Sequence, residues 1–118
     1  MSEKVKILFN PSCSKCNESL DLLKGFSCEI EVIEYLKDTP SENELREIIQ
    51  FLDIKPQNLI RKSEELFKVN FEGKDFSDEE WISIMLKFPE LIERPIVIQG
   101  NKAIIGRPPG LILDFIEN

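Results

Sequence analysis

The sequence predicts an α/β fold in which a mixed four-stranded sheet carries a helical segment inserted in its middle. Short stretches of alternating apolar residues, typical of strands, occur near both ends of the chain. The middle instead carries apolar residues at helical spacing behind two capping-box motifs. Glycine and proline residues stand between several of these segments and mark turns.

The first part of the chain is predicted to form a strand, a helix and a second strand. Val5, Ile7 and Phe9 alternate with polar or second-face residues, and residues 10–12 (Asn-Pro-Ser) end that strand. Residues 16–23 then show helical spacing, with Gly25 as a helix stop. Alternation returns over residues 28–35. Because the connections are short, the two strands are expected to pair in parallel across the helix.

The middle of the chain is predicted to be helical. Ser41-Glu-Asn-Glu44 and Ser77-Asp-Glu-Glu80 are capping boxes, each followed by an apolar stripe. Between them, Pro56 suits the first turn of a short helix that runs to about Lys62. Ser63 is expected to cap a further helix. The insert therefore covers about residues 41–90.

The end of the chain returns to strands. Residues 95–98 and 103–105 are β-branched or aliphatic, and the turn residues 99–102 between them predict an antiparallel hairpin. Residues 111–116 carry the stripe of a terminal helix. This order is that of a thioredoxin-like core with helices inserted, and we expect one domain over residues 1–118.

Composition limits the classes of partner. The chain has 118 residues and a formal net charge of −7, which argues against a nucleic-acid partner. Its apolar runs are far shorter than the roughly 20 residues that span a bilayer. Residues 1–6 do not resemble a secretory signal, so a cytoplasmic protein without a membrane partner is expected.

The pair Cys13-Ser-Lys-Cys16 stands where the first strand passes into the first helix. A helix N-terminus favours the thiolate, Lys15 adds a cation, and Cys16 lies one turn on, where it can act as a resolving thiol. The alternatives are half of a zinc site or two inert thiols. With no histidine, only Cys28 and carboxylates remain as further ligands, so we expect no metal and no bound cofactor. Cys28 itself is expected in the core.

Three arginines stand in distinctive contexts: Arg61 in Ile-Arg-Lys, Arg94 in Glu-Arg-Pro-Ile, and Arg107 in Gly-Arg-Pro-Pro. The planar guanidinium group is suited to binding tetrahedral oxyanions. Spacing along the chain does not show whether the three converge. Pro95 precedes a strand, and a cis peptide there would suit the thioredoxin layout, although cis is a minority state.

With these motifs in order, the chain resembles the glutaredoxin-coupled arsenate reductase family nearly from end to end. The matching segments are Asn10-Pro11-x-Cys13, Tyr35-Leu36 with Thr39-Pro40, Leu59-Ile60-Arg61-Lys62, Leu91 to Val97, and Ile105 to Pro109. The resemblance implies that Cys13, in a loop that begins at Asn10, attacks arsenate to form a covalent adduct. It further implies that Arg61, Arg94 and Arg107 bind the oxyanion, that Pro95 is cis, and that glutathione and a glutaredoxin supply the electrons.

The chain departs from that family at three positions. Phe9 stands where the best-known members have histidine, Cys16 where they have serine, and Asn17 where they have arginine. The cysteine pair leaves two alternatives to an arsenate reductase. One is a general thiol–disulfide oxidoreductase using Cys13 and Cys16. The other is a regulator similar to the Spx proteins, which bind RNA polymerase and use the two cysteines as a disulfide switch.

Overall fold

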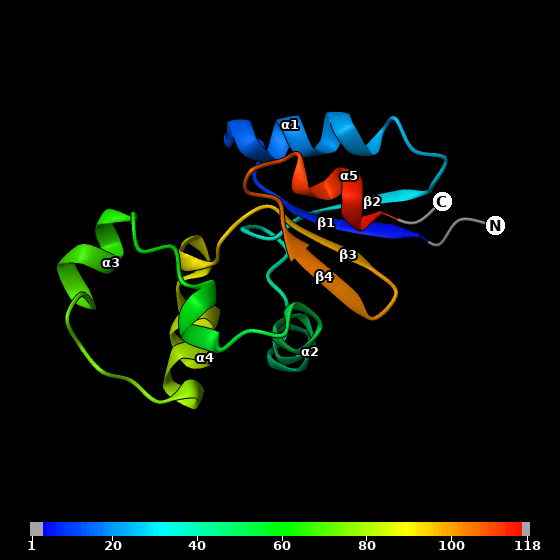
Figure 1. Cartoon of the computed structure of the whole chain (residues 1–118). Coiled ribbons are helices and arrows are strands. Elements are labelled where there is room, and N and C mark those ends of the chain that lie inside the picture. Colours follow the sequence, from blue (N-terminus) through cyan, green and yellow to red (C-terminus); the bar gives the residue numbers. More distant parts are fainter. Residues whose placement is uncertain (1–3, 117–118) are drawn as a thin grey trace. The chain divides into compact units, whose positions relative to one another are not determined.

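A computed structural model of the chain describes residues 4–116, which form two compact units (Figure 1). The first unit holds the parts of the chain before residue 39 and after residue 93, and the second holds residues 39–93. Residues 1–3 lie outside the described residues. They belong to the segment 1–6, which is not expected to be a secretory signal. Among the helices of residues 4–116, none has the length and apolar character needed to cross a membrane.

The first unit is built on the expected mixed sheet, whose strand order is β2-β1-β3-β4. Strand β1 pairs in parallel with β2 and antiparallel with β3, and β3 pairs antiparallel with β4. The elements are β1 (Val5–Phe9), α1 (Ser14–Leu23), β2 (Ile30–Glu34), β3 (Ile96–Gln99), β4 (Lys102–Ile105) and α5 (Leu111–Phe115).

This strand order brings four connecting segments to one edge of the sheet. The register pairs Phe9 with Glu34, Leu8 with Ile96, and Ile96 with Ile105. The carboxyl ends of β1, β2 and β4 and the start of β3 therefore lie together. The cysteine loop, Tyr35, the Arg94–Pro95 bond and the segment that begins at Gly106 all occur there. The topology thus gathers residues that the sequence keeps far apart.

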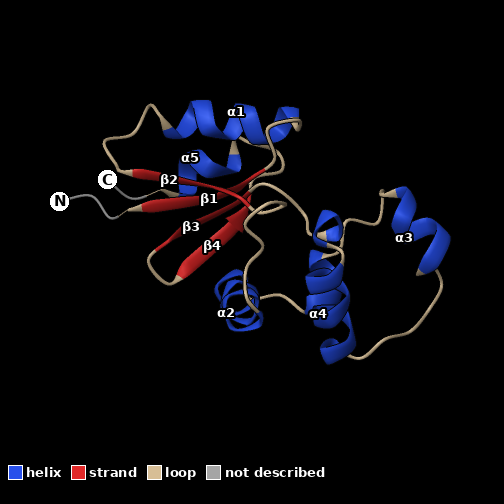
Figure 2. Cartoon of the chain, turned by 180° about the vertical axis from the view of Figure 1, so that it is seen from behind, coloured by secondary structure: helices blue, strands red, loops and turns tan. Residues whose placement is uncertain are grey.

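Helices α1 and α5 cover the same face of the sheet, as both views show (Figures 1 and 2). The core beneath them consists of Val5, Ile7, Phe9, Cys13, Cys16, Leu23, Val97, Ile112 and Ile116. Packing is tight at Gly106, where a Cβ would meet Pro95 Cγ at 3.0 Å, Ser19 Oγ at 3.0 Å and Ile112 Cδ1 at 3.1 Å. Only glycine fits there without displacing a neighbour.

The second unit contains the helical segment: α2 (Glu42–Leu52), η1 (Pro56–Leu59), α3 (Glu65–Asn70), α4 (Asp78–Lys87) and η2 (Pro89–Leu91). Both predicted capping boxes are present. Ser41 accepts from the Glu44 amide and Ser77 from the Glu80 amide, while each glutamate accepts from the amide of its serine. These local signals were sufficient to locate the starts of α2 and α4.

Two helix limits in this unit differ from the prediction. The short helix that begins at Pro56 ends at Leu59 rather than near Lys62. Its continuation is extended because Ile60 forms a β-bridge with Ile92, and the Arg61 amide donates to Leu91 O at 2.7 Å. Helix α3 begins after Glu64, and its N-terminus has no side-chain cap, so Ser63 does not cap it.

Candidate active site

The loop that carries Cys13 is held by local hydrogen bonds. Asn10 Oδ1 accepts from the Ser12 amide at 3.0 Å, and Asn10 O accepts from the Cys13 amide at 2.9 Å. The Asn17 side-chain amide donates to Pro11 O and to Cys13 O, each at 3.0 Å. Cys13 occupies the N-cap of α1 with φ −97° and ψ 120°. Its side chain therefore lies at the positive end of the helix dipole.

Cys13 is a buried thiol that is nevertheless readily ionised. Only 8 % of the residue is exposed, and this burial alone would raise the pKa of its thiol. Hydrogen bonds from the Cys16 amide, the Arg94 guanidinium, the Cys16 thiol and the Lys15 amide outweigh burial and lower the pKa to about 7. The ammonium group of Lys15 instead lies 3.6 Å from Glu18 Oε2. Lys15 thus acts through its backbone more than through its charge.

Arg94 and Arg107 flank the Cys13 sulfur. Arg107 Nη2 lies 3.4 Å from Cys13 Sγ, while its Nε donates to Arg94 O at 2.6 Å. Arg94 is 9 % exposed. The predicted cis Arg94–Pro95 bond is present, and Arg107–Pro108 is a second cis bond that the sequence analysis did not anticipate. Two guanidinium groups beside a thiolate form a site that attracts an anion and holds a nucleophile against it.

Arg61 belongs to the second unit, and its partners there are acidic. Its Nε lies 3.1 Å from Glu64 Oε1 and its Nη1 lies 3.7 Å from Glu93 Oε1. Two of the three arginines, Arg94 and Arg107, therefore converge on Cys13. The approach of Arg61 to the sulfur stays a prediction.

The other two cysteines differ in their surroundings. Cys16 is fully buried in the first turn of α1, and burial raises the pKa of its thiol well above the usual range. Cys28 is half-buried against the core of the first unit, and burial raises its pKa as well. All three thiols are free. Among residues 4–116, no group of three or more His, Cys, Asp or Glu side chains gathers in a way that could hold a metal ion.

The sequence analysis named Tyr35 only in a segment that matches the family and Asn17 only as a departure from it, and assigned neither residue a role in the site. Tyr35 follows β2 and is fully buried, which raises the pKa of its phenol to about 12 while the charge of Arg94 counteracts the rise. Its hydroxyl lies close enough to the Arg94 guanidinium for an interaction that lowers the pKa, and it has no other hydrogen-bond partner among residues 4–116. The position of Tyr35 could have been inferred from the predicted topology. It follows β2, and the carboxyl ends of parallel neighbours such as β1 and β2 lie at the same edge of the sheet.

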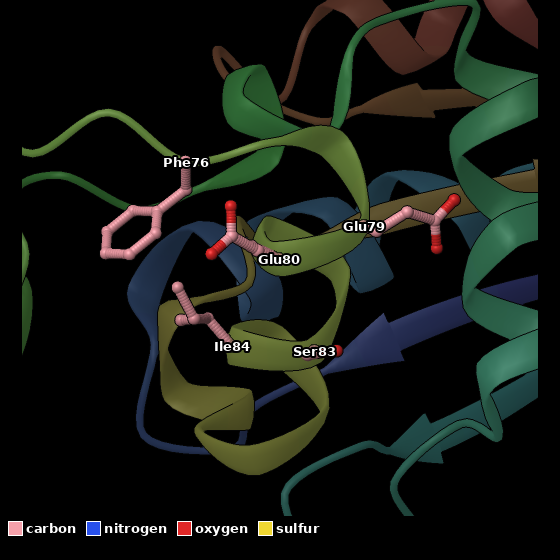
Figure 3. A pocket seen from close by; sticks show the side chains of 5 residues that line it. All are labelled: Phe76, Glu79, Glu80, Ser83 and Ile84. Atoms are coloured by element: carbon pink, nitrogen blue, oxygen red, sulfur yellow. The ribbon is translucent and has the colours of Figure 1, made fainter.

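The second unit also carries a surface hollow of about 330 Å³ (Figure 3). Phe76, Glu80 and Ile84 project to one side of α4, and Glu79 projects to the other. Glu79 is paired with Arg46, and Glu80 accepts from the Ser77 amide in the capping box. The carboxylates of this hollow already have structural partners, so it is not the chemical centre of the molecule.

Comparison with known proteins agrees with this geometry. The profile of the ArsC family matches residues 8–115. An arsenate reductase of Haemophilus influenzae is 40 % identical over 114 residues, covering 95 % of this chain and 98 % of the relative. The uncharacterized protein YfgD of Escherichia coli is 40 % identical over 118 residues, covering 98 % and 99 %. The structure of an arsenate reductase from Vibrio cholerae superposes with a TM-score of 0.91 at 37 % identity, covering 98 % of this chain and all of that one. With the family profile and near-complete relatives in agreement, this chain belongs to the ArsC family.

Proposed function

We propose that this protein is a thiol-dependent oxidoreductase that reduces arsenate to arsenite through a covalent adduct on Cys13. The observation that carries the proposal is the Cys13 sulfur at the start of α1, with Arg107 Nη2 at 3.4 Å and with a hydrogen bond from Arg94 that lowers its pKa. Relatives that carry the name arsenate reductase support the choice of oxyanion. The neighbouring guanidinium groups select for an anionic substrate in an otherwise acidic protein.

In the first step the Cys13 thiolate attacks arsenic, an S–As bond forms and an As–O bond breaks. The departing oxygen leaves as water after taking up a proton, and arsenic stays pentavalent. Arg94 and Arg107 bind the remaining oxygens and stabilise the charge that develops on them. We assign Arg61 the same role, as the resemblance implies, on approach to the bound oxyanion. Asn10 and Asn17 hold the loop and leave the thiolate aimed at the substrate.

The electrons are proposed to come from glutathione and a glutaredoxin in the cytoplasm. A glutathione thiolate that attacks Cys13 Sγ breaks the S–As bond and leaves its electron pair on arsenic, which departs as arsenite. The mixed disulfide on Cys13 is then reduced by the glutaredoxin thiol. Neither glutathione nor glutaredoxin is held as a resident cofactor in this scheme, because each acts as a co-substrate.

A turnover assay with arsenate, glutathione and glutaredoxin tests this function, with arsenite as the measured product. Cys13→Ser should abolish turnover. Arg94→Ala should cost about 2–4 kcal/mol of transition-state stabilisation, as for the loss of one oxyanion donor. Arg46→Ala is the matched control, because Arg46 pairs with Glu42 and Glu79 in the second unit. An active Cys13→Ser variant, or a parent protein that releases no arsenite, would contradict the proposal.

A general thiol–disulfide oxidoreductase is the second candidate. The pairing of an acidified Cys13 with a buried Cys16 in the same helical turn favours it. Reduction of a small model disulfide, measured beside arsenite release, separates the two. Rapid disulfide reduction without arsenite would favour the second candidate, and the reverse would favour the first.

A further inference from the structure

The thiol of Cys16 is enclosed next to the sulfur of Cys13. Cys16 has no exposed surface, and both cysteines belong to the core cluster beneath α1 and α5. The Cys16 thiol hydrogen-bonds the Cys13 sulfur and is one of the groups that lower the pKa of Cys13. An enclosed thiol of this kind is out of reach of glutathione or a protein reductant. The electrophile within its reach is therefore whatever forms on Cys13.

Cys13 has the non-helical backbone that a disulfide to Cys16 needs. Residues three apart on a helix are neighbours, yet a disulfide needs Cβ atoms at roughly 3.5–4.5 Å, closer than two helical positions provide. Cys13 is the N-cap and has extended backbone angles, φ −97° and ψ 120°, while Cys16 lies within the helix. The distance between the Cβ atoms of Cys13 and Cys16 is thus not fixed at the value for two helical residues.

We propose that Cys16 resolves the adduct on Cys13, so that arsenite is released by formation of an internal Cys13–Cys16 disulfide. This inference rests on the proposed function and replaces its glutathione step. Cys16 Sγ attacks Cys13 Sγ, an S–S bond forms and the S–As bond breaks. The electron pair of that bond stays on arsenic, which falls from pentavalent to trivalent, and the Cys16 proton passes to an arsenite oxygen. A dithiol reductant then returns both cysteines to thiols by disulfide exchange.

Electrostatic interactions between the two cysteines favour adduct formation on Cys13 before attack by Cys16. In the resting protein, burial first, and then the hydrogen bond and charge of the Cys13 sulfur, raise the pKa of Cys16, while the Asn10 amide and Arg94 lower it. When Cys13 is bonded to arsenic, its sulfur no longer carries the negative charge that opposes ionisation of Cys16. The influences of Asn10 and Arg94 remain. The Cys16 thiol therefore stays protonated and unreactive while Cys13 is a free thiolate. It ionises more easily, and becomes a better nucleophile, once the adduct has formed on Cys13.

The competing explanation is that Cys16 is only a packing group that donates a hydrogen bond to the thiolate. Serine at this position would keep a donor and remove the redox chemistry. The matched control is Cys28→Ser, because Cys28 lies just before β2 and is half-buried against the core without contributing to the pKa of Cys13.

The experiment is a single turnover of the reduced full chain with arsenate and no external thiol. Parent and Cys28→Ser should each release about one arsenite per protein, lose two hydrogens in mass, and block Cys13 and Cys16 to alkylation. Cys16→Ser should release essentially none until glutathione is added, and should carry the arsenic adduct in the mass spectrum meanwhile.

Two contrary results have different meanings. If the parent behaves like Cys16→Ser, holding the adduct until glutathione arrives, Cys16 is not a resolving thiol and the proposed function stands. If neither protein yields adduct or arsenite, even with glutathione and glutaredoxin, the proposed function fails, and the internal resolution of its adduct fails with it.

Discussion

Removal of the Arg107 guanidinium should raise the pKa of Cys13, and the geometry sets the size of the effect. At the observed 3.4 Å, opposite unit charges attract by about 5 kcal/mol at an effective dielectric constant of 20 and by about 1 kcal/mol in water. Arg107 is partly exposed, so screening favours the lower part of this range. A value of about 2 kcal/mol, typical of a hydrogen bond to a charged group, corresponds to about 1.5 pKa units.

In Arg107→Ala the midpoint of Cys13 ionisation should therefore move from about 7 to about 8.5. At pH 6 the thiolate fraction falls about 30-fold, because the group titrates as an acid whose ionised form is lost when pH drops below the pKa. The more basic thiolate is about 5-fold more nucleophilic, given a Brønsted coefficient of 0.4–0.5. The net alkylation rate of Cys13 at pH 6 should fall about 6-fold.

The assay is iodoacetamide labelling from about pH 5 to about pH 9, with mass spectrometry of peptides to follow each cysteine separately. Arg107→Lys should give an intermediate midpoint, because it keeps the charge and loses the planar donor pair. Arg46→Ala, with its ion pairs in the second unit, should leave the Cys13 midpoint unchanged. An Arg107→Ala protein that melts like the parent and still ionises with the parent's midpoint would refute the reasoning.

Four further substitutions test the packing and the helix caps by urea denaturation. Gly106→Ala should lower the free energy of unfolding by about 1–3 kcal/mol, because its Cβ would meet three side-chain atoms at 3.0–3.1 Å, and an unchanged midpoint would mean that these neighbours yield. Tyr35→Phe should raise stability by about 1 kcal/mol, since the buried hydroxyl makes no well-formed hydrogen bond within residues 4–116, whereas a loss would show that its interaction with Arg94 is stabilising. Ser77→Ala should cost about 1 kcal/mol through loss of the capping box with Glu80, and Ser63→Ala, at a serine that caps no helix, should cost almost nothing; equal losses would contradict the assigned caps.

Local chemistry by itself determined much of the fold. A capping box needs only two residues three apart, so Ser41 and Ser77 predicted the starts of α2 and α4 correctly. The hairpin of β3 and β4 was predicted correctly from its turn residues. The sequence also placed Cys13 at the junction of β1 and α1, since the end of a strand and the start of a helix are both short-range patterns. Where a distant partner intervened, local signals failed, as at Leu59, whose helix ends because Ile60 pairs with Ile92.

Only the tertiary structure decided the chemistry around Cys13. Arg107 is 94 residues away along the chain and reaches the sulfur because β1, β3 and β4 are neighbours in the sheet. The same strand order placed Tyr35 at this edge, which periodicity within a single segment does not encode. The pKa of Cys13 is a difference between burial, which raises it, and hydrogen bonds from the backbone and Arg94, which lower it. Both contributions depend on long-range packing. The sequence motif therefore identified Cys13 as the candidate nucleophile, whereas the tertiary structure determines the pKa of its thiol.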